Sequence, residues 1–193
     1  MRTIDHWEYA KRMTKDLKVS KAKKLAFQIG CVMPDFNKFS YMGHHINDWA
    51  IGHSFRVRRR EIISFFERVF SDSILWWYNA GLKIHYLGDS FSRPHNPEFH
   101  YDSKSHVRYE WKLHDKTQAV LRTRPFAHAK VSGSLGRWLN SRHEKYMKTT
   151  KGIDDDARYI DSTLMGVWDW VKEHVLPPSV LAEKARRHLR MQE

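Results

Sequence analysis

Two pairs of side chains that can bind divalent metals stand at helical spacing in the stretch from residue 85 to residue 110, HYLGDSFSRPHNPEFHYDSKSHVRYE. His85 and Asp89 are four residues apart, as are His106 and Glu110. On a helix each pair lies on one face, one turn apart, so two such helices can direct both pairs into a shared space. Imidazole and carboxylate groups suit zinc or another borderline divalent ion, and the absence of thiolates points to a catalytic rather than a zinc-finger site.

The segment SRPHNP between the two pairs cannot remain helical, because each proline removes a backbone donor and clashes with the preceding turn. His95 therefore sits on an irregular bend, from which it can point inward. With 13 histidines in the chain, a single His–Asp pair is easily a surface feature, but two pairs that flank a proline-fixed histidine favour a metal site. His100, Asp102 and His114 are expected to support the ligands or lie on the surface.

Length and charge limit the classes of protein that fit. The 193 residues, 41% of them hydrophobic, suffice for one core, so we predict a single domain over 1–193, with 179–193 as a charged helical tail. The formal charge of +12 favours a polyanion, an anionic membrane surface or a phosphate-bearing substrate. A basic, soluble surface without a dedicated partner explains the charge equally well.

Cysteine usage and hydropathy bear on location. Cys31 is the single cysteine, so no disulfide can form within the chain and Cys-rich zinc sites are excluded. The sequence has no apolar run of signal-peptide length and none that approaches the length of a transmembrane segment. We therefore predict a cytoplasmic protein, or a secreted one if a leader has been removed.

Helical periodicity dominates the elements that must position the candidate ligands. No alternating strand pattern of useful length appears, which predicts an all-α, single-domain helical bundle with a multinuclear zinc site between its helices. Residues 34–52 contain turn formers and are expected to form a loop. The expected helices span residues 5–17, 22–29, 55–70, 73–89, 105–122 and 155–175, with a shorter basic helix at 138–146.

The order of the motifs resembles a known family. HYLGD, RPH and HVRYE follow the pattern H-x3-D-x5-H-x(n)-H-x3-E of the zinc-dependent phospholipases C, which include alpha-toxin-like enzymes and are related to single-strand-specific zinc nucleases. Upstream, IGCVMPDF resembles the family's G-x3-PD segment, which supplies an aspartate ligand. The resemblance runs from about His6 to Glu110 and implies an all-α fold that holds up to three zinc ions.

The resemblance also implies a ligand set. One ion would be bound by Asp35, His85 and Asp89 together with a loop histidine, for which His53 is preferred to His45 and His44. A second ion would be bound by His95, His106 and Glu110, while Asp89 would bridge toward a third ion at His6. The complete set of metal-binding candidates is His6, Asp35, His53, His85, Asp89, His95, His106 and Glu110. Asp35 is also the candidate that orients or deprotonates the attacking water.

The sequence departs from the family in two respects. Secreted members bind the third ion through the amino group and carbonyl of an N-terminal tryptophan, whereas this sequence begins MRTIDH. Trp7 cannot replace it, since its backbone nitrogen is an amide, and it is expected in the core of the first helix. No residue is assigned to complete the third site, and the sequence shows no counterpart of the lipid-binding β-sandwich of alpha-toxin-like members.

The predicted activity is that of a zinc-dependent phosphoric diester hydrolase, most similar to phospholipase C, which cleaves a phospholipid head group by metal-activated water. Its partners would be a phospholipid or another phosphodiester, with peripheral contact to an anionic membrane and without a transmembrane segment. Alternatives are a zinc nuclease acting on single-stranded nucleic acid and a non-catalytic metal-binding protein. For the nuclease, the basic segments 21–24, 56–60 and 122–124 would follow the phosphates. Trp76, Trp77 and Trp138 would stack on bases, unless they pack in the core.

Overall fold

A computed structural model of the chain describes residues 1–37, 52–123 and 126–181. These residues form helices and short 3₁₀ turns without any sheet, and one isolated β-bridge joins Leu17 to Leu181. The prediction of an all-α fold is confirmed. The α-helices are α1 (Thr3–Thr14), α2 (Lys21–Phe36), α3 (Phe55–Phe66), α4 (Ile74–Asp89), α5 (Ser103–Arg122), α6 (Leu135–Thr149) and α7 (Ile153–His174).

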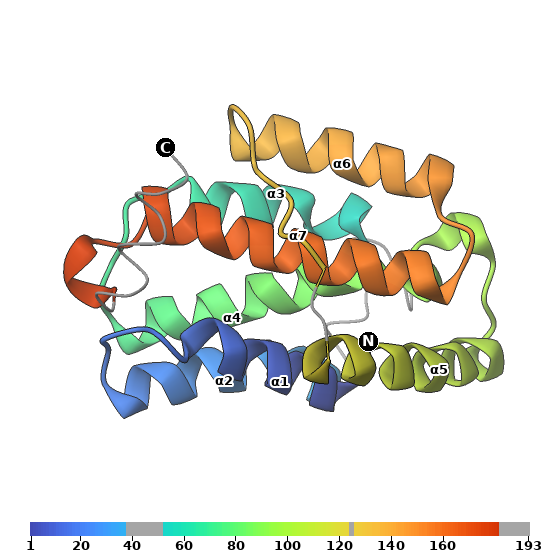
Figure 1. Ribbon diagram of the computed structural model, residues 1–193, viewed down its shortest axis with the longest axis horizontal. Helices are drawn as coiled ribbons and strands as arrows, with labels where there is room; N and C mark the ends of the chain where they lie inside the picture. Colours follow the sequence, from blue (N-terminus) through green and yellow to red (C-terminus); the bar gives the residue numbers. More distant parts are fainter. Residues whose placement is uncertain (38–51, 124–125, 182–193) are drawn as a thin grey trace.

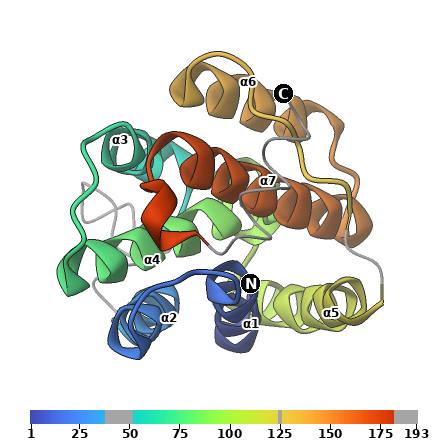
Figure 2. The same ribbon diagram turned by 60° about the vertical axis from the view of Figure 1, so that its left-hand side comes forward.

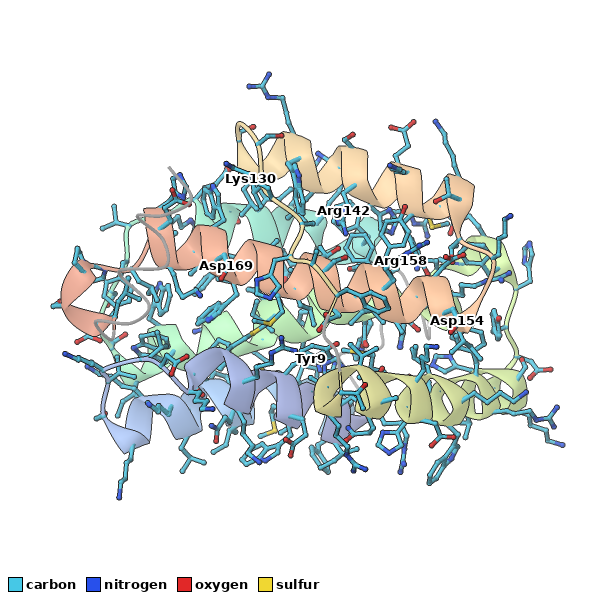
Figure 3. The ribbon with its side chains drawn as sticks, in the orientation of Figure 1. Tyr9, Lys130, Arg142, Asp154, Arg158 and Asp169 are labelled. Atoms are coloured by element: carbon cyan, nitrogen blue, oxygen red, sulfur yellow. The ribbon has the colours of Figure 1, made fainter. Side chains whose placement is uncertain are left out.

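The helices lie in layers around α4 and α7. Figures 1 and 2 show α1, α2 and α5 along the lower side, α6 along the upper side, and α4 and α7 between them. Tyr9 reaches from α1 to α7, where its hydroxyl donates to Asp161 Oδ1 over 3.2 Å (Figure 3). Trp168 Nε1 on α7 donates to the Met13 carbonyl of α1 over 2.9 Å. These buried hydrogen bonds fix the first helix against the last.

Two glycines let α2 and α4 approach more closely than side chains would permit. A Cβ atom at Gly30 would lie 2.1 Å from the Tyr78 carbonyl oxygen, and one at Gly81 would lie 2.1 Å from the Phe27 carbonyl oxygen. Neither position can accept a larger residue without separating the helices. The close crossing brings the end of α2, which carries Asp35, beside the last turns of α4.

Aromatic side chains fill the core between these helices. Trp76 and Trp77 are buried at 7% and 0% exposure, and Trp138 packs against the core from α6. The first two cannot stack on bases, so core packing is the correct interpretation for them. Trp7 differs from its prediction: it is half-buried and lines a surface groove, because α1 turns this residue outward between α2 and α5.

Several helix boundaries differ from those predicted. α2 continues through Pro34 to Phe36, where a loop was expected, because a proline in the last turn removes only one backbone hydrogen bond. α1 ends at Thr14, before the expected residue 17, since the next residues pair with the C-terminal segment: Lys18 N–H donates to the Val180 carbonyl over 2.7 Å. α3 ends at Phe66 instead of residue 70, and α6 is longer than the predicted 138–146.

Pro178–Val180 forms a 3₁₀ turn at the start of the expected C-terminal tail, and the rest of that tail lies outside the described residues. Over the part of the chain that the structure describes, every helix is too short or too polar to cross a membrane.

Candidate metal centre

The predicted ligands converge where α1, α2, α4 and α5 meet the beginning of α3 and the bend after α4. Their donor atoms fall into three groups, in each of which all atoms lie within 4.8 Å of one another. The groups are His6, Asp35, His85 and Asp89; His53, Asp89 and His95; and His95, His106 and Glu110. Asp89 and His95 each belong to two groups, so the three form one continuous cluster.

Asp89 lies at the centre of this cluster and is fully buried. Its Oδ2 is 2.7 Å from His53 Nδ1 and 3.1 Å from His85 Nε2. Its Oδ1 is 3.2 Å from His6 Nε2. His95 Nε2 lies 3.6 Å from Oδ2. A carboxylate with both oxygens surrounded by imidazoles can bridge two divalent ions.

In the first group, the backbone of α2 orients the His85 ring. His85 Nδ1 lies 2.8 Å from the Cys31 carbonyl oxygen and must donate to it, because a carbonyl only accepts. This leaves the lone pair on His85 Nε2 free for a metal and directs it toward Asp35, whose Oδ1 is 3.7 Å away. The rings of His6 and His85 are stacked, with their centroids 3.9 Å apart.

The third group comes from α5 and from the bend between α4 and α5. Glu110 Oε1 is 3.2 Å from His95 Nε2 and 3.4 Å from His106 Nε2. Glu110 and His106 share one face of α5 at the predicted four-residue spacing, and the Arg93–His95 turn brings His95 opposite them. The bend therefore directs His95 inward, as the prolines predicted.

The amino group of Met1 also enters the cluster. It lies 2.8 Å from Asp89 Oδ1 and 3.2 Å from Glu110 Oε1, and Met1 itself is 2% exposed. Asp5 holds the adjoining backbone, since its Oδ2 accepts from the Arg2 N–H over 3.3 Å. Sequence analysis missed Met1, because nothing in the type of this residue marks its amino group as a ligand.

The charges of the cluster suit a metal. Burial lowers the pKa of His53 to about 3 and also lowers that of His6, so both imidazoles are neutral. Burial raises the pKa of Asp89, but the facing imidazoles and the Met1 amino group have the larger, opposite effect. The pKa of Asp89 therefore lies well below its usual value. The Met1 amino group and the imidazoles of His106 and His95 lower the pKa of Glu110 despite its burial. Burial lowers the pKa of His85, but the Asp89 and Asp35 carboxylates raise it above its usual value, so a metal ion bound there would displace a proton. Neutral imidazoles and ionised carboxylates are the protonation states that bind metal ions.

The chemistry of this donor set fits zinc. His53 Nδ1 and His85 Nε2 are only 3.2 Å apart inside the protein, and His95 Nδ1 has no hydrogen-bond partner among the described residues. Two imidazole nitrogens this close inside a protein cost free energy unless a cation or a proton lies between them. A buried nitrogen without a partner is costly as well. Imidazole and carboxylate ligands without thiolate are those of catalytic zinc sites.

All eight predicted ligands are present in the cluster. His53 Nδ1 lies 3.2 Å from His85 Nε2 and 2.7 Å from Asp89 Oδ2, so it is beside the two residues with which it was expected to bind. His6 lies beside Asp89, as expected, and it also groups with Asp35 and His85, because α1 packs beside α2 and places His6 over the His85 ring. His44 and His45 lie outside the described residues.

Three other residues named from the sequence lie around the cluster. Asp102 caps α5 by accepting from the Ser105 N–H over 2.7 Å. His114 lies 2.7 Å from Asp5 Oδ1 and thereby supports the segment that carries Met1. His100 is exposed, with a left-handed φ of 52°.

The bend that carries His95 is fixed by a buried carboxylate of α7. Asp156 is fully buried, and its Oδ2 accepts from the Arg93 N–H over 2.8 Å and from the Tyr109 hydroxyl over 2.9 Å. Its Oδ1 accepts from the Tyr146 and Thr150 hydroxyls over 3.0 and 2.9 Å. One side chain thus ties α5, α6 and the bend to α7.

A groove of about 690 Å³ leads from the surface to the cluster. Met1, Asp35 and Glu110 form its polar end, where they can face a substrate. Its remaining walls are Arg2, Thr3, Ile4, Trp7, Val32 and Phe36. The sides of the groove are thus mainly apolar, with Arg2 and Thr3 as polar members, and its inner end is ionic.

Comparison with known proteins agrees with this geometry. The family model of zinc-dependent phospholipase C matches residues 5–153, which contain all the predicted ligands, most of α1 and all of α2 to α6. No curated protein and no solved structure gives a significant match. Because the matched region covers well over half of the sequence and contains the clustered ligands in the family's order, the chain belongs to the zinc-dependent phospholipase C family.

Proposed function

We propose that the protein is a zinc-dependent phosphodiester hydrolase that cleaves the head group from a phospholipid. The observation that carries the proposal is the buried cluster around Asp89, which opens into a groove whose side walls are mainly apolar. Such a groove suits a molecule with a charged head and an apolar tail. Zinc, when bound, supplies a Lewis acid that activates water and stabilises the charge that develops on the phosphate oxygens. All eight predicted residues would serve as its ligands.

Asp35 and Glu110 are the carboxylates that reach the groove. Asp35 is held at the end of α2 beside His85, from where it can orient a water molecule toward phosphorus and accept its proton. Glu110 faces the same space between His95 and His106, and the proposal assigns it to metal binding.

For a chain whose first residue is Met1, the amino group of this residue is proposed as the further ligand that the sequence does not identify. Burial lowers its pKa, but the Asp89 and Glu110 carboxylates raise it more, to about 12. Without metal it is therefore a cation that neutralises these two carboxylates. Zinc binding would displace its proton and leave a nitrogen donor beside the His6 group.

The test is a panel of bis-p-nitrophenyl phosphate, phosphatidylcholine, phosphatidylglycerol and single-stranded DNA, assayed with zinc and after chelation. We expect zinc-dependent release of diacylglycerol and a phosphorylated head group. Asp35→Asn should reduce the rate by about 10²–10⁴-fold, as expected for loss of a general base. The exposed Asp115→Asn on α5 is the matched control and should retain the rate.

Other outcomes of the same panel would replace the proposal. Cleavage of DNA alone would assign the site to a nuclease. A protein that binds zinc and hydrolyses no member of the panel would contradict the enzymatic proposal and favour a metal-binding protein without this activity.

A further inference from the structure

A row of apolar side chains covers the outer face of α2. Leu25, Ile29, Met33 and Phe36 follow one another at intervals of four, four and three residues, and they are 49%, 38%, 39% and 72% exposed. This spacing places them on one side of the helix. The opposite side of α2 is the one that packs on α4, so the exposed row is not part of the core.

The row leads to the mouth of the groove. Phe36 belongs to both, and Ile4, Trp7 and Val32 continue the apolar surface along the groove walls. Ile4 is 45% exposed although it lies only a few residues from the buried Met1. The entrance to the metal cluster is therefore bordered mainly by apolar side chains, with Arg2 and Thr3 among them.

Helix α5 extends this surface on the other side of the entrance. Val107 and Trp111, one turn apart, are 56% and 53% exposed. The Arg2 guanidinium lies 3.4 Å from the centroid of the Trp111 ring, which connects α5 to the groove wall. Exposed apolar residues scattered singly are common, but a continuous set that surrounds a site indicates an interaction surface.

The charges beside this surface are mainly positive. Lys21 is exposed one turn before Leu25, and Arg108 and Lys112 are exposed on α5 directly after Val107 and Trp111. The acids nearby are Glu8, one turn after Ile4, which is paired with Lys11 over 3.2 Å, and the exposed Asp115, one turn after Trp111. A second copy of this chain, with the same formal charge of +12, would be repelled, whereas an anionic bilayer would be attracted.

We propose that this surface, formed by the α2 row, the groove entrance and the Val107–Trp111 turn of α5, docks onto a bilayer that contains anionic phospholipid. The apolar side chains enter the interface while the lysines and arginines contact the lipid phosphates. Docking would place the entrance against the head groups. The inference rests on the proposed function for its purpose, but binding itself requires no hydrolysis.

The test measures flotation of the protein with vesicles of phosphatidylcholine alone and of phosphatidylcholine with phosphatidylglycerol, after chelation so that no lipid is cleaved. We expect stronger binding to the anionic vesicles. The double variant Ile29→Glu and Met33→Glu should bind at least about tenfold more weakly, because it loses two apolar contacts and adds two negative charges. Leu25→Glu provides an independent single variant, and circular dichroism would verify that each variant is folded.

The matched control is Asn140→Glu with Ser141→Glu, which makes the same change in charge at exposed positions of α6. Figures 1 and 2 both show α6 on the side of the molecule opposite α2. The control should bind vesicles almost as well as the unaltered protein. Equal losses in the control and the α2 variants would reduce the effect to net charge and overturn the proposal.

Hydrolysis separates this inference from the proposed function. With zinc, the α2 variants should retain cleavage of soluble bis-p-nitrophenyl phosphate and lose cleavage of vesicle lipid. Vesicle binding that depends on α2, in a protein without any hydrolytic activity, would support docking and refute the proposed function. Unaltered vesicle binding by every α2 variant would refute docking alone, and concentration-dependent dimers that the same changes abolish would assign the surface to self-association.

Discussion

At the residue scale, Asp89 connects the parts of the metal cluster. It belongs to two of the three donor groups, and its oxygens face His6, His53 and His85. Asp89→Asn preserves the shape but removes the charge that bridging requires, so we expect it to lose more than one zinc ion per chain. Elemental analysis measures this, with the exposed Asp115→Asn as control. Zinc content equal to that of the unaltered protein would show that Asp89 does not bridge.

The Met1 amino group gives a second prediction at this scale. A short Gly-Ser extension before Met1 converts the amine to an amide and moves the charge away from Asp89, so we expect weaker binding of one zinc ion. The same extension at the other end of the chain is the control. Zinc titration followed by calorimetry distinguishes them, and intact mass verifies the N-terminus of each protein. Identical titrations would remove Met1 from the ligand set.

Local spacing, which helices impose directly, indicated only some of the predicted ligands, whereas His6, Asp35 and His53 were implied by the resemblance to the family. The pairs His85 with Asp89 and His106 with Glu110 need only one turn of helix each. Met1 could not be found in this way, because its place depends on how α1 packs against α4 and α5. The family's use of an N-terminal amine was the available signal, but the side chain of Met1 gives no indication of that role.

At the scale of elements, the bend between α4 and α5 depends on α7 through Asp156. Asp156→Ala would leave the Arg93 N–H and the Tyr109 and Tyr146 hydroxyls without their buried acceptor, at a cost of at least about 2 kcal/mol. We also expect lower zinc occupancy, because His95 follows Arg93. Urea unfolding and metal analysis measure the two effects.

The control for Asp156 stands two residues earlier on the same helix. Asp154 is 82% exposed and pairs with Lys116 of α5 at the position labelled in Figure 3, so Asp154→Ala should cost within about 1 kcal/mol. If Asp156→Ala unfolds at the same urea concentration and retains its zinc, the bend is held by its other contacts.

Helix α6 supports the bend through His143, which predicts a pH dependence. His143 Nε2 lies 3.1 Å from the Ser90 carbonyl oxygen and 3.1 Å from Asn96 Oδ1. Burial lowers the pKa of His143 from 6.5 to about 4, although the Ser90 carbonyl raises it in part. Between these values the unfolded chain binds a proton that the native protein does not, so this residue makes stability fall as pH falls from 6.5 to about 4.

Thermal unfolding of the zinc-free protein across this pH range tests the link. His143→Gln should show a shallower decline, by up to about 1.4 kcal/mol per pH unit. His174→Gln, at an exposed position at the end of α7, should follow the unaltered protein. A pH profile of His143→Gln that parallels the unaltered profile would place the titration elsewhere.

At the scale of the whole molecule, the periodicity of apolar residues predicted which segments are helical. It predicted less well where each helix ends and against which other segments it packs. α4 and α5 agree closely with the predicted 73–89 and 105–122, since apolar spacing and capping residues define them locally. α1 ends early because Leu17 pairs with Leu181, a contact between opposite ends of the chain. The approach of His6 and His53 to His85 likewise depends on the packing of helices that are distant in the sequence, which spacing within one segment cannot reveal.

The central claim is that a multinuclear zinc cluster in this chain hydrolyses phospholipid, and one titration tests it most directly. Zinc is added in known equivalents to the chelated protein, and diacylglycerol release from phospholipid is measured together with bound zinc. We predict that release begins when more than one ion per chain is bound and that it is absent from Asp89→Asn. A protein that binds more than one zinc ion in this cluster and releases no diacylglycerol would contradict the account.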